Sequence, residues 1–294
     1  MADKYSYYLG IAMFKIGIIG YGFVGKAMHK TFEHNSDAYI VDPKYSEWTV
    51  EDYATSKPEV IFICLPAPTM DHGGVDSSLI TDVMWRLSSI KYEGIVVVKS
   101  TLPPDTVQTL YDTFMHDNKL NFHLLRYVYS PEFLRETNWE KDAVNPDRIV
   151  LAGDYHDCKK VEEWYKNHSH VPRHARFMLA DYKEAALIKY AANTFLATKV
   201  VFMNQLHQLY TDLLGPPHPD DWSAFTDMLC ADVRIGTSHV KVPGPDGKYG
   251  YGGTCFPKDV RAMNGFDKYN RLTLLAEAEE ANTHLRLTGG PRLP

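Results

Sequence analysis

Short apolar runs recur through the first half of the chain, and each is followed by residues that form turns or caps. Stretches with a helical spacing of apolar positions separate these runs. The alternation of strand and helix predicts an α/β fold with a doubly wound parallel sheet. We expect its strands at residues 14–19, 38–41, 60–65, 95–99, 124–129 and 148–152. Ligands of such sheets bind beyond the carboxyl ends of the strands.

The second half of the chain is predicted to be mainly helical. Residues 181–214 contain no proline or glycine, their apolar positions recur with helical spacing, and Gly215-Pro216-Pro217 ends the pattern. A helix of this length spans about 50 Å, which is more than a small domain needs. We therefore expect it to pack against its own copy in a homodimer. Shorter helices are expected at residues 220–231, 259–269 and 272–285.

Composition limits the classes of function. The chain has 294 residues and a formal net charge of −6, without Lys/Arg runs, which argues against a nucleic-acid partner. No apolar run is long enough to span a bilayer. The four cysteines form no C-x-x-C pair and no zinc-type Cys/His cluster, so we expect no metal. Thiols in a chain of this length fit a reducing cytosol, and a cytoplasmic location is expected.

A glycine-rich turn follows the first predicted strand and precedes a helical stretch. It reads Gly20-Tyr21-Gly22-Phe23-Val24-Gly25, the G-x-G-x-x-G pattern of a dinucleotide-binding turn. The first glycine makes the turn, the second lets a pyrophosphate approach the backbone, and the third lets helix and strand pack closely. Asp42 ends the second strand, where a carboxylate grips the ribose hydroxyls and repels a 2′-phosphate. We therefore predict a Rossmann-type domain that binds NAD rather than NADP.

Two further sets of polar residues are candidates for a site. Ser130-Pro131-Glu132-Phe133-Leu134-Arg135-Glu136 is predicted to begin a helix, because Ser130 can cap it and Pro131 suits its first position. Glu132 and Glu136 would then share one face. Lys189 and Asn193 lie four apart on the long predicted helix. Spacing alone favours a solvated surface for either pair.

A thiol stands in a glycine-rich loop near the end of the chain, in Gly250-Tyr251-Gly252-Gly253-Thr254-Cys255-Phe256-Pro257-Lys258-Asp259. Pro257 suits the first turn of a helix, so Cys255 is expected at or just before a helix N-terminus with Lys258 close by. Both features lower a thiol pKa and favour the nucleophilic thiolate. Cys64, Cys158 and Cys230 lie in apolar or helical surroundings and are expected to be buried. Cys255 is therefore the candidate nucleophile.

These motifs together resemble the UDP-glucose/GDP-mannose dehydrogenase family. The resemblance rests on the glycine turn, Lys99-Ser100-Thr101-x-Pro103, residues 130–136 with Pro146-Asp147-Arg148-Ile149-Val150, Lys189-x-x-x-Asn193 and residues 252–259, all in family order over about residues 13–287. Pro146-Asp147-Arg148 and Arg234-Ile235-Gly236 look more like the UDP-glucose branch. We expect the C-terminal nucleotide-binding domain of the family to have no counterpart here, with the loop 242–251 as a candidate substitute.

The resemblance implies a reaction and a set of site residues. Two NAD would oxidise the C6 alcohol of a nucleotide sugar, UDP-glucose being favoured, to a carboxylate through a thiohemiacetal and a thioester on Cys255. This would supply UDP-glucuronate for polysaccharide biosynthesis. The implied catalytic residues are Cys255, Lys189, Asn193, Asp259, Glu132 and Thr101. The implied cofactor-binding residues are Gly20, Tyr21, Gly22, Phe23, Val24, Gly25, Asp42, Thr101, Glu136 and Lys258. The implied substrate-binding residues are Glu132, Phe133, Leu134, Arg135, Lys189, Asn193, Arg234, Tyr249 and Gly252.

The domain division follows from these assignments. Residues 13–180 are expected to form the NAD-binding domain, and residues 181–294 a helical central domain that carries Cys255 and the dimer contacts. Residues 1–12 are interpreted as an N-terminal extension. Three alternatives stay open: the same chemistry on GDP-mannose or a UDP-N-acetylhexosamine, an NAD-binding subunit that needs a partner, and a two-electron dehydrogenase of a small 3-hydroxy acid that has no need of Cys255.

Overall fold

The structure, a computed structural model, describes residues 13–70, 73–116, 122–135 and 138–289. These residues divide into two compact units. The sheet unit comprises residues up to 67 together with 76–189, and the helical unit comprises 68–75 and 190 onward. The boundary lies inside the long helix α7 (Tyr182–Leu214), between Lys189 and Tyr190. The expected N-terminal extension, residues 1–12, lies outside the described residues.

The sheet unit is built on a predominantly parallel sheet. Its described strands are β1 (Phe14–Ile19), β2 (Ser36–Val41), β3 (Val60–Ile63), β4 (Ile95–Val98), β5 (Arg126–Tyr129), β6 (Ile149–Gly153) and β7 (Phe177–Ala180). They are ordered β2-β1-β3-β4-β5-β6-β7, and the pairs are parallel apart from β5 with β6. The predicted doubly wound sheet is confirmed. The strand β7 and the antiparallel pair are additions that the sequence pattern did not predict.

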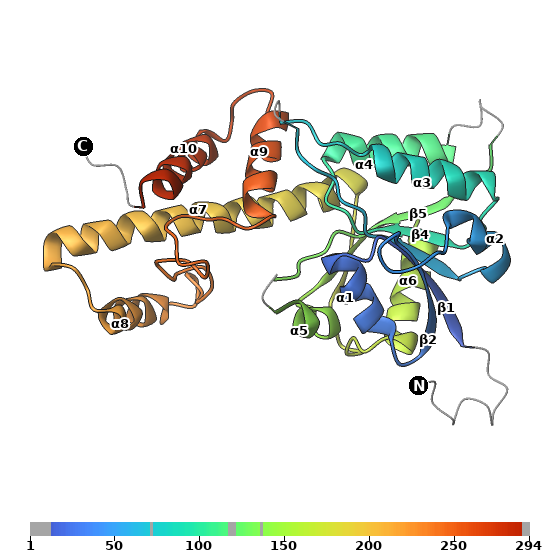
Figure 1. Cartoon of the computed structure of the whole chain (residues 1–294), viewed down its shortest axis with the longest axis horizontal. Helices are drawn as coiled ribbons and strands as arrows, with labels where there is room; N and C mark the ends of the chain where they lie inside the picture. The colour runs from blue at the N-terminus through green and yellow to red at the C-terminus, as the bar shows by residue number, and fades with distance from the viewer. Residues whose placement is uncertain (1–12, 71–72, 117–121, 136–137, 290–294) are drawn as a thin grey trace. The chain divides into compact units, whose positions relative to one another are not determined.

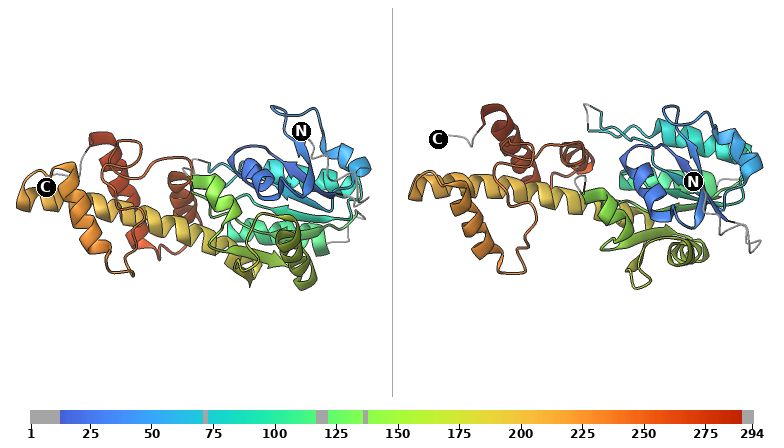
Figure 2. Two further views of the ribbon diagram at one scale, coloured as in Figure 1. Left: turned by 90° about the horizontal axis from the view of Figure 1, so that it is seen from below. Right: turned by 60° about the horizontal axis from the view of Figure 1, so that its bottom comes forward.

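Helices cover both faces of the sheet, with α3 and α4 on one face and α1, α5 and α6 on the other (Figures 1 and 2). Their bounds are α1 (Phe23–Phe32), η2 (Val50–Asp52), α2 (Tyr53–Ser56), α3 (Ser78–Ser89), α4 (Pro104–Tyr111), η3 (Asp112–His116), α5 (Trp139–Val144) and α6 (Tyr155–His168). Strands β3 and β4 are buried along their whole length, as expected of a sheet covered on both faces. Phe32 and Tyr165 bring α1 and α6 into the same apolar core as Phe62 of β3.

The helical unit consists of the larger part of α7 with α8 (Pro219–Cys230), α9 (Phe256–Phe266) and α10 (Thr273–Thr288). The 33 residues of α7 confirm the predicted long helix. Val201 of α7, Val260 of α9 and Leu275 of α10 belong to one buried cluster. Segment 68–75 packs on α9, where the Cα of Gly265 has no room for a side chain beside the backbone of Gly73. No helix in the described ranges combines the length and apolarity that a membrane crossing requires.

The predicted helix over residues 130–136 is wrong. Residues 131–135 are not helical, and the next helix is α5. Local side chains take the backbone donors instead: the Glu132 carboxylate accepts the Leu134 N–H at 2.6 Å, and Asp142 accepts the Arg135 N–H at 2.8 Å. Such bonds compete with helical ones. Glu136 lies outside the described residues, so its expected role is not placed.

Candidate active site

The glycine turn between β1 and α1 has the geometry that a dinucleotide needs. Gly20 has φ +87°, in the left-handed region that favours glycine. A Cβ on Gly25 would lie 2.0 Å from the Gly20 carbonyl oxygen, so the helix and the turn pack too closely for any residue with a side chain at this position. A Cβ on Gly22 would meet nothing within 4 Å, which leaves this backbone open to an approaching phosphate. The N-terminus of α1 adds the positive end of a helix dipole.

Asp42 lies directly after β2 and is tied to the glycine turn. Its Oδ2 accepts the N–H of Tyr21 at 2.7 Å, and its Oδ1 accepts the N–H of Lys44 at 2.9 Å. The carboxylate is thus fixed beside the turn that receives a pyrophosphate, where it fits the ribose hydroxyls of a dinucleotide. The expected grouping of the turn with this acid is present in the structure.

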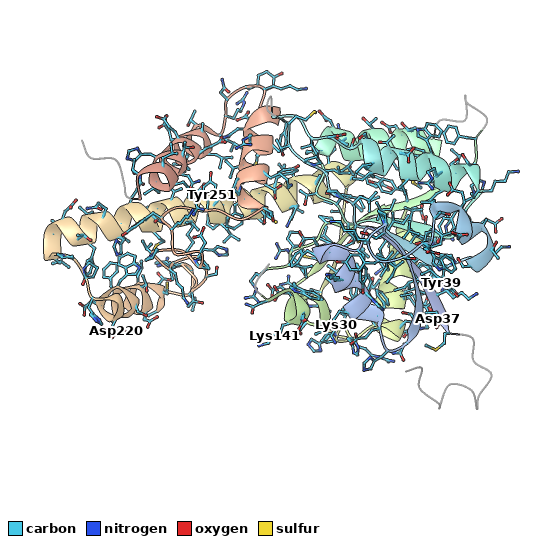
Figure 3. The ribbon with its side chains drawn as sticks, in the orientation of Figure 1. Lys30, Asp37, Tyr39, Lys141, Asp220 and Tyr251 are labelled. Atoms are coloured by element: carbon cyan, nitrogen blue, oxygen red, sulfur yellow. The ribbon has the colours of Figure 1, made fainter. Side chains whose placement is uncertain are left out.

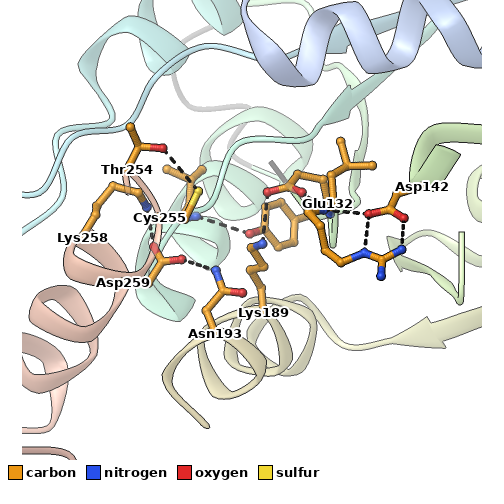
Figure 4. A network of polar contacts seen from close by, with 12 residues as sticks. Glu132, Asp142, Lys189, Asn193, Thr254, Cys255, Lys258 and Asp259 are labelled. Atoms are coloured by element: carbon orange, nitrogen blue, oxygen red, sulfur yellow. Dashed lines mark hydrogen bonds and ion pairs between the residues drawn. The ribbon is translucent and has the colours of Figure 1, made fainter. Parts of the chain in front are cut away.

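A buried ion pair in the sheet unit joins the loop after β5 to α7. Lys189 Nζ donates to Glu132 Oε1 at 3.0 Å, and the two side chains are 3% and 9% exposed. The second carboxylate oxygen accepts the Leu134 N–H. The surface reading of Lys189 is therefore overturned. A charge pair with such burial is costly to assemble, and it holds a cation and a proton acceptor in fixed positions (Figure 4).

Lys99 is a further buried lysine. It begins the motif Lys99-Ser100-Thr101-x-Pro103, but no role was predicted for it from the sequence. It follows β4, and its Nζ donates to the Ser130 hydroxyl at 3.0 Å. Burial lowers the pKa of Lys99 to about 8. Burial has the opposite effect on the Cys64 thiol, whose pKa it raises to about 12. The signal was a lysine directly after a fully apolar strand. Thr101 lies two residues beyond, half-buried in the loop that precedes α4.

Cys255 is the N-cap residue of α9, as the sequence predicted. It is partly exposed, whereas Cys64, Cys158 and Cys230 are buried. Its backbone oxygen accepts the Asp259 N–H at 2.9 Å, and its Sγ lies 3.7 Å from the Thr254 hydroxyl. The thiol is therefore accessible to a reagent and placed at the positive end of a helix.

Two asparagines that the sequence reasoning missed hold the loop leading to Cys255. The Asn282 carboxamide accepts the Tyr251 N–H at 2.6 Å and donates to the Tyr251 carbonyl at 3.2 Å. The Asn204 Oδ1 accepts the Gly250 N–H at 3.0 Å. Figure 3 labels Tyr251 beside α7. Both asparagines lie in the interior of a helix, a position that marks them as buried polar residues only once the fold is known.

Asp259 is the buried centre of a second polar cluster, which lies in the helical unit. Asn193 Nδ2 donates to Asp259 Oδ2 at 2.6 Å, and Lys258 Nζ pairs with Asp259 Oδ1 (Figure 4). The Asp259 side chain is 1% exposed. Asn193, which spacing alone assigned to a surface, is thus buried. The Lys258 ammonium group is paired with the Asp259 carboxylate. Asp259, one helical turn after Cys255, thus brings an amide and an ammonium group to its own carboxylate.

The remaining predicted substrate residues are spread over both units. In the sheet unit, the Arg135 guanidinium is paired with Asp142, and the Phe133 ring lies 4.1 Å from the Arg148 guanidinium carbon. In the helical unit, Arg234 is 87% exposed and paired with Asp232. Tyr249 packs against the cores of that unit, and Gly252 lies against the Arg286 guanidinium. These groups are positioned by their own contacts, and their roles stay predictions.

The chain is similar to known proteins in its family domains, its sequence and its fold. The model of the UDP-glucose/GDP-mannose dehydrogenase family, NAD binding domain, matches residues 44–169, and the model of the family's central domain matches residues 183–284. A UDP-glucose 6-dehydrogenase of Rickettsia felis is 32% identical over 208 residues, covering 70% of this chain and 43% of that protein. A putative UDP-glucose 6-dehydrogenase of Bacillus subtilis is 33% identical over 208 residues, covering 69% and 45%. The chain spans about half the length of the curated relatives it matches.

Solved structures share the fold. A UDP-glucose dehydrogenase from Pyrobaculum islandicum superposes with a TM-score of 0.74 at 24% identity, covering 92% of this chain and 69% of that one. A 3-hydroxyisobutyrate dehydrogenase of Mycobacterium tuberculosis gives 0.68 at 14% identity, covering 95% and 96%. Most of the residues that match the NAD-binding family model belong to the sheet unit. The glycine turn and Asp42 of this unit fit NAD, and NAD is its cofactor. With both family domains matched in order over most of its length, the chain belongs to the UDP-glucose/GDP-mannose dehydrogenase family.

Proposed function

We propose that this chain carries out the NAD-dependent four-electron oxidation of the C6 alcohol of UDP-glucose to the carboxylate of UDP-glucuronate. The curated relatives named UDP-glucose 6-dehydrogenase support this substrate. The observation that carries the proposal is the partly exposed Cys255 at the N-cap of α9, next to the buried Asp259 cluster. An accessible thiol at a helix N-terminus is the arrangement of a covalent nucleophile.

The first oxidation turns the C6 alcohol into an aldehyde. A hydride leaves C6 for NAD, and the hydroxyl proton passes to a base. Lys189, fixed by its bond to Glu132, stabilises the developing negative charge on the C6 oxygen as a nearby cation. Asn193, held by Asp259, donates its amide to a substrate oxygen in this proposal.

The second oxidation proceeds on the thiol. Cys255 Sγ bonds to C6 of the aldehyde, the aldehyde oxygen takes a proton, and a thiohemiacetal results. A second hydride leaves C6 for a second NAD, and loss of the hydroxyl proton gives a thioester. Water then adds to C6, the C–S bond breaks, and the thiol is regenerated with its proton. Glu132 serves as the base that activates this water, with Thr101 holding it. C6 loses four electrons in total, and two NAD are reduced.

We further propose a homodimer that forms through residues 181–214, in which residues 13–180 bind the cofactor and residues 181–294 carry the thiol. Large apolar side chains exposed along α7 support this assembly, among them Phe195 at 71%, Phe202 at 59% and Leu213 at 72% exposure. Exposed apolar surface of this extent favours protein contacts. A cytoplasmic role in polysaccharide biosynthesis is part of the same proposal.

Other sugars and another reaction class are the alternatives. The structure of a GDP-mannose dehydrogenase of Pseudomonas aeruginosa shares the fold, with a TM-score of 0.59. A panel of GDP-mannose, UDP-glucose and UDP-N-acetylhexosamines therefore tests which sugar nucleotide is the substrate. The chain also covers 96% of a 3-hydroxyisobutyrate dehydrogenase structure. A two-electron oxidation of a 3-hydroxy acid has no need of Cys255, so thiol dependence separates the two classes.

The proposal is tested with Cys255→Ser and Cys255→Ala, and Cys230→Ser serves as the control because Cys230 is a free but buried thiol. We expect both Cys255 variants to form no UDP-glucuronate from UDP-glucose and NAD, and the Cys230 variant to keep its activity. Mass spectrometry of acid-quenched wild-type protein should find the sugar nucleotide bound through a thioester to Cys255. UDP-glucuronate formation by either Cys255 variant at the wild-type rate would remove the covalent role.

A further inference from the structure

Three potential metal ligands converge at the far end of α1, outside the candidate active site. Glu33 is the C-cap residue of α1, His34 follows it, and His170 lies in the segment between α6 and β7. One Glu33 carboxylate oxygen, Oε1, is 3.8 Å from His34 Nδ1 and 3.8 Å from His170 Nε2. The ligand atoms of all three residues lie within 4.8 Å of one another.

The distances between these ligand atoms are close to the distances between the ligand atoms around a bound transition metal. Zinc binds imidazole nitrogen and carboxylate oxygen at about 2.0–2.2 Å in tetrahedral sites, which puts neighbouring ligand atoms about 3.4 Å apart. The observed spacing exceeds this by about 0.4 Å for two of the three separations. Small rotations of exposed side chains close such a gap. Two imidazoles and one carboxylate match the donor set that zinc and neighbouring divalent metals prefer.

The two segments that supply the ligands are already joined. The His170 N–H donates to the Thr31 carbonyl at 2.8 Å, which fixes the loop after α6 against the last turn of α1. The two imidazole rings contact each other edge to face, with centroids 4.3 Å apart. The C-terminal end of α1 is the negative end of the helix dipole, which favours a cation at this place. The ligands are therefore preorganised by backbone contacts that do not depend on a metal.

Lys30 is the competitor of the metal for this carboxylate. It lies in the last turn of α1, where Figure 3 labels it, and its Nζ pairs with Glu33 Oε1 at 2.5 Å. One of the oxygens that would bind the metal is therefore shared with an ammonium group.

We propose that Glu33, His34 and His170 bind one divalent transition-metal ion of the zinc class, with water completing the coordination. The ion links the C-terminal end of α1 to the segment between α6 and β7. The N-terminal end of α1 follows the glycine turn. The site takes no part in the oxidation chemistry, and it stands whether or not UDP-glucose is the substrate. The competing explanation is a set of weak surface ion pairs, which bind no metal.

The test uses the full chain without an affinity tag, stripped with EDTA, in a Cys255→Ser background so that the accessible thiol does not bind the ion. Zinc binding is followed by titration calorimetry and cobalt binding by its visible absorption. We expect one ion per chain with a micromolar Kd, and a Tm about 5 °C higher at a roughly hundredfold zinc excess over Kd.

Variants decide which residues hold the ion. Removing a residue that only hydrogen-bonds to a metal ligand weakens metal binding about 10–100-fold. Removing a ligand itself should cost at least as much, so His34→Ala, His170→Ala and Glu33→Gln should each weaken binding by at least about tenfold. His174→Ala is the matched control, an exposed histidine in the same segment outside the cluster, and should bind as the parent does. Lys30→Met should tighten binding about two- to fivefold, because it removes the competitor. No binding by the parent, or parental affinity in both His34→Ala and His170→Ala, overturns the proposal.

Discussion

Replacing Lys189 by methionine removes the cation from an ion pair that is almost fully buried. The Nζ and Oε1 atoms lie 3.0 Å apart, and the side chains are 3% and 9% exposed, so the Glu132 carboxylate would be left without its partner and with little water. Breaking a buried pair in this way costs about 3–5 kcal/mol. At about 2–4 °C per kcal/mol, Lys189→Met should lower the Tm by roughly 6–20 °C.

The double variant Glu132→Gln/Lys189→Met separates this stability effect from catalysis. It leaves no uncompensated charge, so we expect it to recover most of the lost free energy of unfolding while activity stays absent. Lys183→Met is the matched control on the same helix, because Lys183 pairs with Asp105 at 3.6 Å and both side chains are exposed. Its effect should stay within about 0.5 kcal/mol.

Urea unfolding at constant m-value, followed by circular dichroism, measures all four proteins. The reasoning is refuted if Lys189→Met unfolds at the wild-type urea concentration, or if the double variant is no more stable than Lys189→Met alone. Either result would mean that water reaches Glu132 in the folded protein and that the pair does not hold the cation in place.

Three further predictions follow from the sheet unit. The pKa of buried Lys99 is about 8 in the folded protein against about 10.4 when unfolded, so the unfolded chain binds more protons between these values. The free energy of unfolding should therefore rise by about 2.5 kcal/mol from pH 8 to 10.4, and Lys99→Met, measured by urea unfolding, should lack this rise. Gly25→Ala should lower the Tm because its Cβ meets the Gly20 carbonyl, whereas Gly22→Ala should leave the Tm near wild type and weaken NAD binding in fluorescence titrations; equal Tm values for the two would contradict this. Asp42→Asn removes the charge that repels a 2′-phosphate and should raise NADP affinity relative to NAD by about tenfold or more. An unchanged ratio of NAD affinity to NADP affinity in the same titration would count against the role of Asp42.

Local signals explain how much of the fold was predictable. The strand–turn–helix of residues 14–32 was found because its glycines sit directly after an apolar run, and α7 because 33 residues lack any helix breaker. Strand β7 (Phe177–Ala180) lies at the sheet edge, and its apolar run is only four residues long. Periodicity alone cannot tell so short an apolar run from a segment of a buried helix. The absence of a helix at residues 131–135 depends in part on Asp142, seven residues beyond Arg135, and no local pattern contains that bond.

The site was predictable as a list of residues but not as an arrangement. Motif resemblance named Glu132 and Lys189, which lie 57 residues apart, and Asn193 and Asp259, which lie 66 apart. Spacing alone assigned Lys189 and Asn193 to a solvated surface, because a partner distant in sequence leaves no local trace. The Cys255 position was the exception, since Pro257 two residues later marks the helix start by itself.

The number of NADH formed per UDP-glucose consumed tests the central claim most directly. The account predicts two NADH for each sugar nucleotide, with UDP-glucuronate as the product and no aldehyde released, because Cys255 holds the sugar between the two hydride transfers. One NADH per substrate, with wild-type turnover in Cys255→Ala, would contradict the covalent four-electron reaction and favour a two-electron dehydrogenase on the same fold.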